Sequence, residues 1–407
     1  MSASPDLLPT NRDENWRYAN LRPLAKAAPD AVGPSQSLAS PALPPVLPGY
    51  ERWSFVDGHF SPPLSGVAHD SAASLMDFRE AGLEIAKQLD SDLAQAGTDF
   101  SLARINLQRE SKVLYVRVPD GAEARLELNF IAATAAAVGT SYPRVQVHAG
   151  RGSRVSIVER HLSAHVRDPA INAAFDLALG RDATLDHCRL QNCANGASVF
   201  DTLTAHVGER AMYRLRAITL GGLSSRSTQF VTLAGRAASC ELTVASVANE
   251  QQTHDFFAQI EHAGPATRTR ELYRGIATGR GKLGFNGKMI VRADAVDADS
   301  DQSLKTLLAG NGAEAAVRPQ LEIYTDKVRA KHGATIGKLD DQMLFYLLSR
   351  GLDRSQAQAL LQWAFIEDAI SQVELAALRQ EIEQLIAPRL NDVSALGNVS
   401  RLPLELP

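Results

Sequence analysis

Hydrophobic and polar residues alternate in short stretches through the middle of the chain, from about residue 99 to residue 331. The clearest stretches are residues 112–118, 125–130, 144–148 and 154–158. Successive side chains of a strand point to opposite faces, so this alternation predicts strands with one buried face.

A glycine-led turn recurs between the later stretches, at Gly150, Gly180, Gly208, Gly235 and Gly264. The steps between these glycines are 30, 28, 27 and 29 residues. Glycine suits turns because it adopts positive φ without steric cost. A near-constant step that holds two strand-like stretches predicts a β-solenoid, in which each coil buries its apolar face on the next. A large β-sandwich with regular hairpins is the alternative, because sandwiches also have closely spaced turns.

Before the solenoid, residues 71–97 change to a three-to-four residue spacing of apolar side chains, which predicts amphipathic helix. We therefore expect an N-terminal helical region over residues 51–98. Residues 1–50 are polar and then rich in Pro, Ala and Ser, which predicts a leader followed by an extended linker. The apolar positions of the predicted helix are Leu75, Phe78, Leu83, Ile85, Ala86, Leu89 and Leu93.

Helix signals return after Gly337, so we expect the solenoid to span residues 99–337. Three helices are predicted over residues 338–390, and residues 391–407 are expected to form a tail. A capping side chain accepts a hydrogen bond from the first turn, and a glycine often ends a helix. The signals are Asp340 with Gly351, Asp353 with Gln356, and Ser371 with Glu374.

Composition narrows the classes of function. The 407 residues include 42 Lys+Arg and 46 Asp+Glu, for a formal net charge of -4. A chain without a basic excess is a poor nucleic-acid binder, and no apolar run approaches the ~20 residues that a membrane helix needs. The cysteines are too few for a disulfide framework, and the N-terminus lacks the apolar core of a signal peptide. We expect a cytoplasmic protein with neither a nucleic-acid nor a membrane partner.

The common catalytic motifs are missing from the sequence. It contains no GxxxxGK[ST] loop, no GxSxG elbow and no HExxH motif, which argues against a conventional hydrolase, kinase or dehydrogenase. His161 and His165 have the spacing of a helical metal pair, but their surroundings predict a strand that runs into a loop. His187 and Cys188 are neighbours on a predicted strand, so they point to opposite faces.

An acidic stripe keeps an enzymatic alternative open. Carbohydrate lyases and hydrolases are also built on β-helices, and they line one face with charged side chains. The residues concerned are Asp294, Asp297, Asp299 and Asp301. The favoured interpretation of this run is a solvated strand face or a turn. A self-associating structural solenoid is a further alternative.

One long segment resembles a known family. Residues 319–340 read PQLEIYTDKVRAKHGATIGKLD and continue into LFYLLSRG at residues 344–351. This segment closely resembles the signature of the SufB/SufD family of iron-sulfur cluster assembly proteins, and PTNRDENWRYANLRPL at residues 9–24 is similar to the SufD leader. The resemblance implies a mainly β chain, with a right-handed parallel β-helix core flanked by N-terminal and C-terminal helical regions.

The resemblance also implies a role without catalysis. The chain would be a scaffold subunit that pairs with a SufB-like subunit and carries a SufC-like ABC ATPase, to which ATP turnover belongs. No cofactor would be bound stably. Iron or a nascent iron-sulfur cluster would be held transiently at the heterodimer interface, where His332 of the HGAT motif is the candidate ligand. We place His332 in a loop that joins the last predicted strand to the first C-terminal helix, where a purely structural role is the alternative.

Two partner surfaces follow from these expectations. The last predicted strand, residues 321–329, should be an exposed edge that pairs with the SufB-like subunit, because an unpaired strand is a template for another chain. The same edge could pair two copies of this chain when that subunit is absent. The edge candidates are Leu321, Ile323, Tyr324 and Val328. The candidates for docking the ATPase on the C-terminal helices are Phe345, Tyr346, Arg350, Trp363, Phe365 and Glu367.

The sequence departs from the family pattern at one position. Members often have a cysteine two residues before the histidine, and this chain has Ala330 there. Thiolate ligands would then come from another chain or from a distant cysteine such as Cys240. The departure favours the SufD-like branch of the family.

Overall fold

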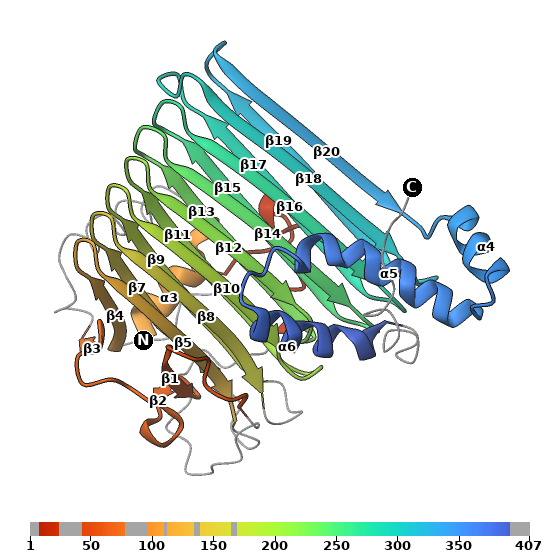
Figure 1. Cartoon of the computed structure of the whole chain (residues 1–407), viewed down its shortest axis with the longest axis horizontal. Coiled ribbons are helices and arrows are strands. Elements are labelled where there is room, and N and C mark those ends of the chain that lie inside the picture. The colour runs from red at the N-terminus through yellow and green to blue at the C-terminus, as the bar shows by residue number, and fades with distance from the viewer. Residues whose placement is uncertain are drawn as a thin grey trace.

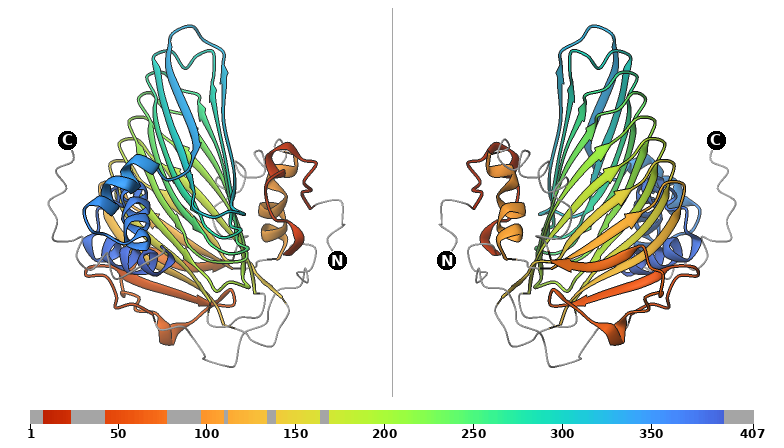
Figure 2. Two further views of the ribbon diagram at one scale, coloured as in Figure 1. Left: turned by 90° about the vertical axis from the view of Figure 1, so that its right-hand side faces the viewer. Right: turned by 90° about the vertical axis from the view of Figure 1, so that its left-hand side faces the viewer.

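The computed structural model describes residues 8–23, 43–77, 97–109, 112–133, 139–163 and 169–390. Within these residues the chain winds into a parallel β-solenoid whose coils stack along one axis (Figure 1). Each coil of the main body adds one strand to each of two sheets, which face one another across the interior (Figure 2). The mainly β solenoid predicted from the glycine repeat is therefore confirmed.

The two sheets have ten strands each. Sheet 1 runs in the order β2 (His59–Phe60), β1 (Glu51–Val56), β5 (Glu123–Ala132), β8 (Arg154–Ser163), β10 (Thr184–Asn192), β12 (Met212–Thr219), β14 (Ser239–Ala248), β16 (Arg268–Ala277), β18 (Ala298–Leu308) and β20 (Val328–Gly337). Sheet 2 runs in the order β19 (Glu314–Ile323), β17 (Lys282–Val291), β15 (Thr253–His262), β13 (Ser224–Leu233), β11 (Ser198–Val207), β9 (Ala170–Leu179), β7 (Arg144–Ala149), β4 (Lys112–Val118) and β3 (Ala73–Asp77), with β6 (Thr140–Ser141) beside β9.

The pairing pattern decides against a β-sandwich. Among the described strands, all pairs are parallel except β1 with β2 and β3 with β4. Hairpins would instead pair successive strands antiparallel. Thr184 pairs with Arg154 of the coil before it and with Met212 of the coil after it. Those separations of 30 and 28 residues equal the first two glycine steps.

The repeating glycines mark the turns for a reason other than the predicted one. A Cβ at Gly235 would lie 2.1 Å from the amide nitrogen of Glu209, and a Cβ at Gly264 would lie 2.7 Å from the carbonyl oxygen of Gly235. Positive φ falls two residues later in each turn, at Ala237 (56°) and Ala266 (57°). The glycines are needed because each turn packs against the backbone of the preceding turn, where no side chain fits.

Apolar side chains of both sheets fill the interior as one cluster. It runs from Trp53 on β1 to Leu304 on β18. Inward and outward residues alternate along each strand, as the pleat requires. The core therefore fixes which residues face the interior, including several polar ones described below.

Two helices cover the outer face of sheet 1. They are α5 (Arg354–Ile370) and α6 (Ala376–Ile386), and they lie across the strands (Figure 1). Ile366 and Ile382 of these helices pack with Ile218 of the sheet in a second apolar cluster. Two ion pairs add to this contact. Arg160 pairs with Glu381 at 2.8 Å, and Arg274 pairs with Asp368 at 2.5 Å.

Shorter elements lie against the outer face of sheet 2, on the side opposite α5 and α6 (Figure 2). The helix α3 (Ser101–Arg109) follows the 3-10 turn η4 (Gly97–Phe100). Trp16 of the 3-10 turn η2 (Glu14–Trp16) is fully buried beneath Arg226, whose guanidinium lies 4.4 Å from the ring centre. The leader predicted for residues 1–50 thus includes a packed segment.

The predicted N-terminal helical region is wrong where the structure describes it. Within residues 51–77 the chain forms β1, β2, the 3-10 turn η3 (Pro62–Leu64) and β3. Leu75, assigned to a helix from spacing, belongs to the antiparallel pair of β3 with β4. Residues 78–96 of the predicted helix lie outside the described residues.

The predicted C-terminal helices are largely confirmed. The helix α4 (Asp341–Ser349) begins at Asp340, whose carboxylate accepts from the amides of Gln342 and Met343. Asp353 and Gln356 form the predicted capping box of α5. The third predicted cap is wrong, because α5 continues to Ile370 and Ser371 ends it. The helix α6 begins after Leu375 without a side-chain cap, and the 3-10 turn η5 (Ala387–Arg389) follows it.

Among the helices in the described part of the chain, none is long and apolar enough to cross a membrane.

Candidate functional site at the open end of the solenoid

The solenoid ends on β19 and β20, which are the last strands of sheets 2 and 1. Each pairs with one strand on its inner side, β19 with β17 and β20 with β18. Among the described residues, no strand pairs with the outer edge of either one. Most residues of β20 are exposed as a result. This end therefore presents free backbone donors and acceptors, which is the property of an edge strand that invites pairing.

His332 lies in the middle of β20, and the predicted junction loop is wrong. The strand continues to Gly337 and pairs with β18 along its whole length. Strand register places Leu242, Glu271, Gln302 and His332 in one row across β14, β16, β18 and β20. Leu242 belongs to the interior core, so the row lies on the inward face. His332 is thus an inward-facing residue that is exposed because no further coil of the described chain covers it.

The predicted edge strand over residues 321–329 is also wrong. Leu321 and Ile323 end β19, Tyr324 lies in the turn, and Val328 begins β20. Leu321 packs against the interior core and Val328 against a small cluster at the turn. Ile323 and Tyr324 remain exposed, at 40% and 58%. The exposed edges are longer than predicted, because they include both complete strands.

The predicted docking residues of the C-terminal helices separate into two groups. Phe345 and Tyr346 of α4 are exposed, at 72% and 51%, and the guanidinium of Arg350 lies 5.0 Å from the Tyr346 ring centre. Exposed Met343 on the same helix was missed. We define the α4 patch as Met343, Phe345, Tyr346 and Arg350.

The second group anchors α5 instead. Trp363 and Phe365 are half-buried and pack against the apolar cluster between the helices and sheet 1. Glu367 is half-buried too, and burial together with the nearby charge of Glu383 raises its pKa above the ordinary value. These three residues offer a partner less surface than the α4 patch does.

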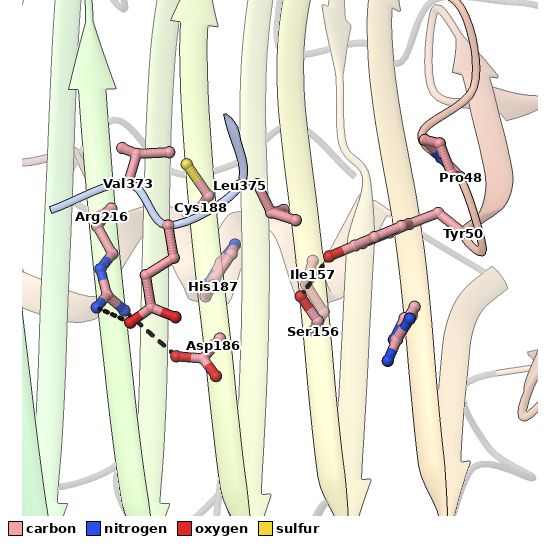
Figure 3. A pocket seen from close by; sticks show the side chains of 12 residues that line it. Pro48, Tyr50, Ser156, Ile157, Asp186, His187, Cys188, Arg216, Val373 and Leu375 are labelled. Atoms are coloured by element: carbon pink, nitrogen blue, oxygen red, sulfur yellow. Dashed lines mark hydrogen bonds and ion pairs between the residues drawn. The ribbon is translucent and has the colours of Figure 1, made fainter. Parts of the chain in front are cut away.

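A pocket of about 440 Å³ lies between the outer face of sheet 1 and the connection from α5 to α6 (Figure 3). Three of its charged side chains pair with one another. Arg216 lies 3.3 Å from Asp186 and 3.7 Å from Glu374. The Tyr50 hydroxyl and the Ser156 hydroxyl are 2.7 Å apart. Arg125 also lines the pocket, and its partner Glu123, at 3.4 Å, lies outside the lining.

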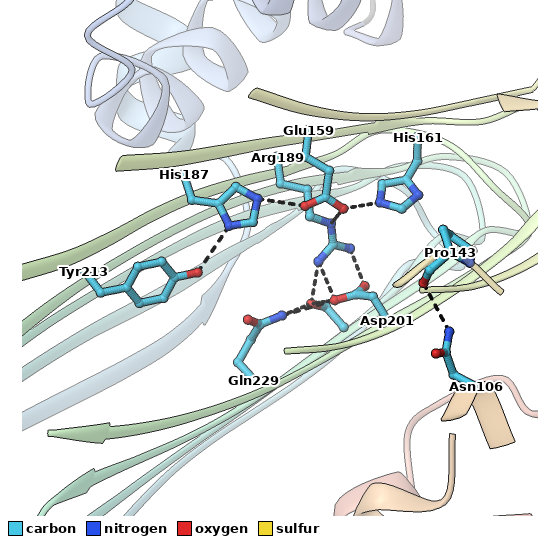
Figure 4. Close-up of polar contacts among 10 residues, drawn as sticks. Asn106, Pro143, Glu159, His161, His187, Arg189, Asp201, Tyr213 and Gln229 are labelled. Carbon is cyan, nitrogen blue, oxygen red and sulfur yellow. Dashed lines mark hydrogen bonds and ion pairs between the residues drawn. The ribbon is translucent and has the colours of Figure 1, made fainter. Parts of the chain in front are cut away.

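A polar cluster crosses the interior of the solenoid between the two sheets (Figure 4). Glu159 of β8 accepts hydrogen bonds from His161 and, at 2.7 Å, from His187. Arg189 of β10 pairs with Asp201 of β11 at 2.5 Å. Burial alone would raise the pKa of Glu159, but the two histidines outweigh it and hold that pKa well below the ordinary value. Sequence reading missed this cluster because its members come from three strands.

The remaining candidate ligands have other roles. His187 faces the interior whereas Cys188 packs in the outer cluster, as strand geometry predicted. His165 of the predicted metal pair lies outside the described residues, and His161 binds Glu159. Among the described residues, no group of three or more His, Cys, Asp or Glu side chains could hold a metal ion.

Burial also keeps the cysteines as thiols. It raises the pKa of Cys188 and of Cys193 to about 12, and raises that of Cys240 further. Cys240 lies in the interior, in the register row that ends at Ala330. Two strands separate it from that position, so it lies far from His332.

The acidic stripe is divided between a turn and the outer face of β18. Asp297 adopts positive φ in a turn, and Asp299 lies on the outer face of β18. Asp299 pairs with Arg270 at 3.2 Å and with Arg329 at 3.8 Å, and the Arg270 hydrogen bond lowers its pKa. These contacts favour the interpretation of a solvated face and turn.

The family model described as "SUF system FeS cluster assembly, SufBD core domain" matches residues 130–365. The chain belongs to the SufBD family. This membership gives it a role in the SUF system of iron-sulfur cluster assembly, and it confirms the resemblance found in the sequence. The matched residues run from β5 to α5. The SufBD core therefore contains the polar cluster around Glu159 and Arg189, the register row that ends at His332, and the α4 patch.

Individual relatives agree with the family match. The chain is 28% identical to the iron-sulfur cluster assembly protein SufD of Escherichia coli over 394 residues, covering 94% of this chain and 89% of that protein. It is 27% identical to the SufBD family protein slr0076 of Synechocystis, over 94% of this chain and 87% of that protein. The SufD protein of Bacillus subtilis matches at 25% identity over 58% of this chain and 54% of that protein.

Proposed function

We propose that the chain is a SufD-like, non-catalytic scaffold subunit of an iron-sulfur cluster assembly complex. It pairs with a SufB-like subunit at the open end, docks a SufC-like ATPase on its C-terminal helices and assists the entry of iron, which is cargo here. The observation that carries this proposal is the position of His332. It is an imidazole on the inward face of a terminal strand whose outer edge pairs with no other strand that the structure describes.

The open end suits a partner with the same architecture. A second solenoid could continue both sheets by pairing with β19 and β20, and its end would cover His332. The interior face of the last coil would then become buried, which places the imidazole between two chains. Thiolates for a cluster would come from the partner, because this chain has Ala330 beside His332 and buried thiols elsewhere. A second copy of this chain could use the same edges when the SufB-like subunit is absent.

The ATPase would bind at the α4 patch. Replacing Phe345 with aspartate should weaken co-purification with a SufC-like ATPase at least about 30-fold, because interface aromatics that fill a pocket commonly contribute 2 kcal/mol or more. Arg350→Glu should weaken it as well. The measurement is the mass and subunit content of the co-expressed complex.

A matched control for the docking test is Val67→Asp, which also introduces a charge at an exposed apolar residue, far from α4 along the chain. It should leave the complex intact. Full recovery of the ATPase with both Phe345→Asp and Arg350→Glu would contradict docking at α4. Pairing with the SufB-like subunit should be unaffected by either substitution.

Iron handling is tested by replacing His332 with alanine in the co-expressed complex. The variant complex should keep its mass, since the proposed pairing uses the backbone edges of β19 and β20, but its iron and sulfide content after reconstitution should fall severalfold. His148→Ala is the control, because His148 is an exposed strand histidine on β7, near the opposite end of the solenoid. Equal cluster content in all three complexes would assign His332 a structural role.

A further inference from the structure

Behind His332, the row on the inward face continues into the protein through Gln302 and Glu271. Both side chains are 2% exposed, and the carboxamide nitrogen of Gln302 donates to Glu271 Oε2 at 2.5 Å. The same nitrogen donates to the carbonyl oxygen of Gly287 at 3.2 Å. A buried carboxylate and a buried amide therefore meet within one coil of the open end.

Gly287 on the facing sheet makes room for this pair. A Cβ at position 287 would lie 2.6 Å from Glu271 Oε2 and 2.8 Å from Gln302 Nε2. Both contacts are far shorter than a carbon atom tolerates, so any side chain there would displace the pair. The backbone of Gly287 instead approaches closely and supplies its carbonyl oxygen as an acceptor.

The two acceptors, Glu271 Oε2 and the Gly287 carbonyl oxygen, fix the orientation of the Gln302 amide. If the amide turned over, its oxygen would face the Gly287 carbonyl oxygen, which has no proton to give. This holds whether Glu271 is charged or neutral. The oxygen of Gln302 is thereby left over, and among the described atoms it is buried without a hydrogen-bond partner. An unpaired buried acceptor costs free energy, so a donor is favoured there.

His332 is the next side chain of the row and can supply that donor. Gln302 and His332 are register partners on adjacent strands, with side chains on the same face. Adjacent strands lie roughly 4.8 Å apart, and the exposed imidazole can turn toward its neighbour. Histidines that bind metals commonly donate their other ring N–H to a carbonyl or carboxylate, which fixes the ring and its tautomer.

We propose that Glu271 and Gln302 form a positioning relay for His332. Glu271 and the Gly287 carbonyl hold the Gln302 amide, its oxygen accepts one ring N–H of His332, and the other ring nitrogen keeps a lone pair for a ligand at the open end. This inference deepens the proposed function. The relay rests on the proposed function only for the identity of the ligand at the open end. Gln302 and Glu271 are positioning residues, since neither needs to touch iron.

The test reads the tautomer of His332 in the purified chain. Histidines are labelled with 15N, His332 is assigned from the His332→Ala variant, and the two ring nitrogens are compared at a pH where the ring is neutral. One hydrogen bond to the ring should bias the tautomer ratio about fivefold, so Gln302→Leu should shift the wild-type ratio by about that factor. Glu271→Leu should shift it part of the way, because the Gly287 carbonyl remains.

The control is Lys305→Leu, an equally apolar substitution at an exposed residue of the same strand, which should leave the ratio unchanged. Thermal melts followed by circular dichroism identify any variant that has lost its fold. Equal ratios in wild type and folded Gln302→Leu would overturn the relay. A fivefold shift in a chain that assembles no clusters with its partners would keep the relay and overturn the proposed function instead.

Discussion

Replacing Arg189 with leucine is expected to lower the free energy of unfolding by about 3–5 kcal/mol, because it removes one partner of a buried ion pair. The Arg189 guanidinium donates to Asp201 at 2.6 Å and to the Ser227 hydroxyl at 2.8 Å, and it lies 3.8 Å from Glu159. All of these groups face the interior. Burial raises the pKa of Asp201 and Arg189 opposes this, so without the arginine the carboxyl group would have to take up a proton.

Protonation of Asp201 should make the loss of stability in Arg189→Leu depend on pH. An acid whose pKa is higher in the folded protein than in the unfolded chain binds more protons when folded, so its contribution to stability is lost as pH rises. The variant should therefore lose stability relative to wild type as pH rises above the ordinary titration range of an aspartic acid. Denaturant unfolding at a series of pH values measures this.

Arg292→Leu is a suitable control, since it breaks the Arg292–Glu261 pair at the surface, where an ion pair contributes about 0–1 kcal/mol. The double variant Arg189→Leu with Asp201→Leu should recover part of the loss, because it removes both charges. If Arg189→Leu were no less stable than the surface control, the expected loss would be contradicted. Water would then have to reach the polar cluster around Asp201. If the single variant fails to fold, recovery in the double variant carries the test.

The sequence was most informative where a local rule and the tertiary structure agree. The glycine step predicted the coil length because every coil repeats the same close approach of turns, as at Gly235. The caps at Asp340 and Asp353 were predicted because a capping contact involves only neighbouring residues. At Ser371 the same spacing failed, since Ile366 and Ile370 pack on sheet 1 and keep α5 helical up to Ser371, which caps its C-terminus instead of starting the next helix.

The open end was harder to predict because its last strand, β20, lacks a buried face. Alternation identifies strands only where one face is apolar, and within the described ranges no coil lies beyond β20 to bury its inward residues. His332 was therefore placed in a loop. The polar cluster in the interior was not predicted, for the converse reason. Glu159 and Asp201 are polar residues on inward faces, and which strands face each other is a property of the stacked coils.

Glu271 provides the second large effect, as a pH dependence of stability. Burial raises the pKa of Glu271 from 4.5 to about 7, against an opposing hydrogen bond from Gln302. Because the folded pKa is raised, Glu271 stabilises the fold below about pH 4.5, and this contribution is lost as pH rises through about 7. At 1.36 kcal/mol for each pKa unit, the loss between pH 5 and pH 8 is about 2–3 kcal/mol.

Glu271→Gln should abolish this slope, since the glutamine has nearly the same shape, can still accept from Gln302 and cannot ionise. The difference in unfolding free energy between variant and wild type should grow in favour of the variant by about 2–3 kcal/mol from pH 5 to pH 8, while all other titrating groups cancel. Glu314→Gln, at an exposed carboxylate, is the control and should follow wild type. Parallel curves for all three proteins would mean that Glu271 ionises in contact with water, so that solvent enters the last coils through the open end. A slope present in wild type and missing in Glu271→Gln would instead establish a dry polar pair directly behind His332, which is the environment in which a single amide oxygen can hold an imidazole in one orientation.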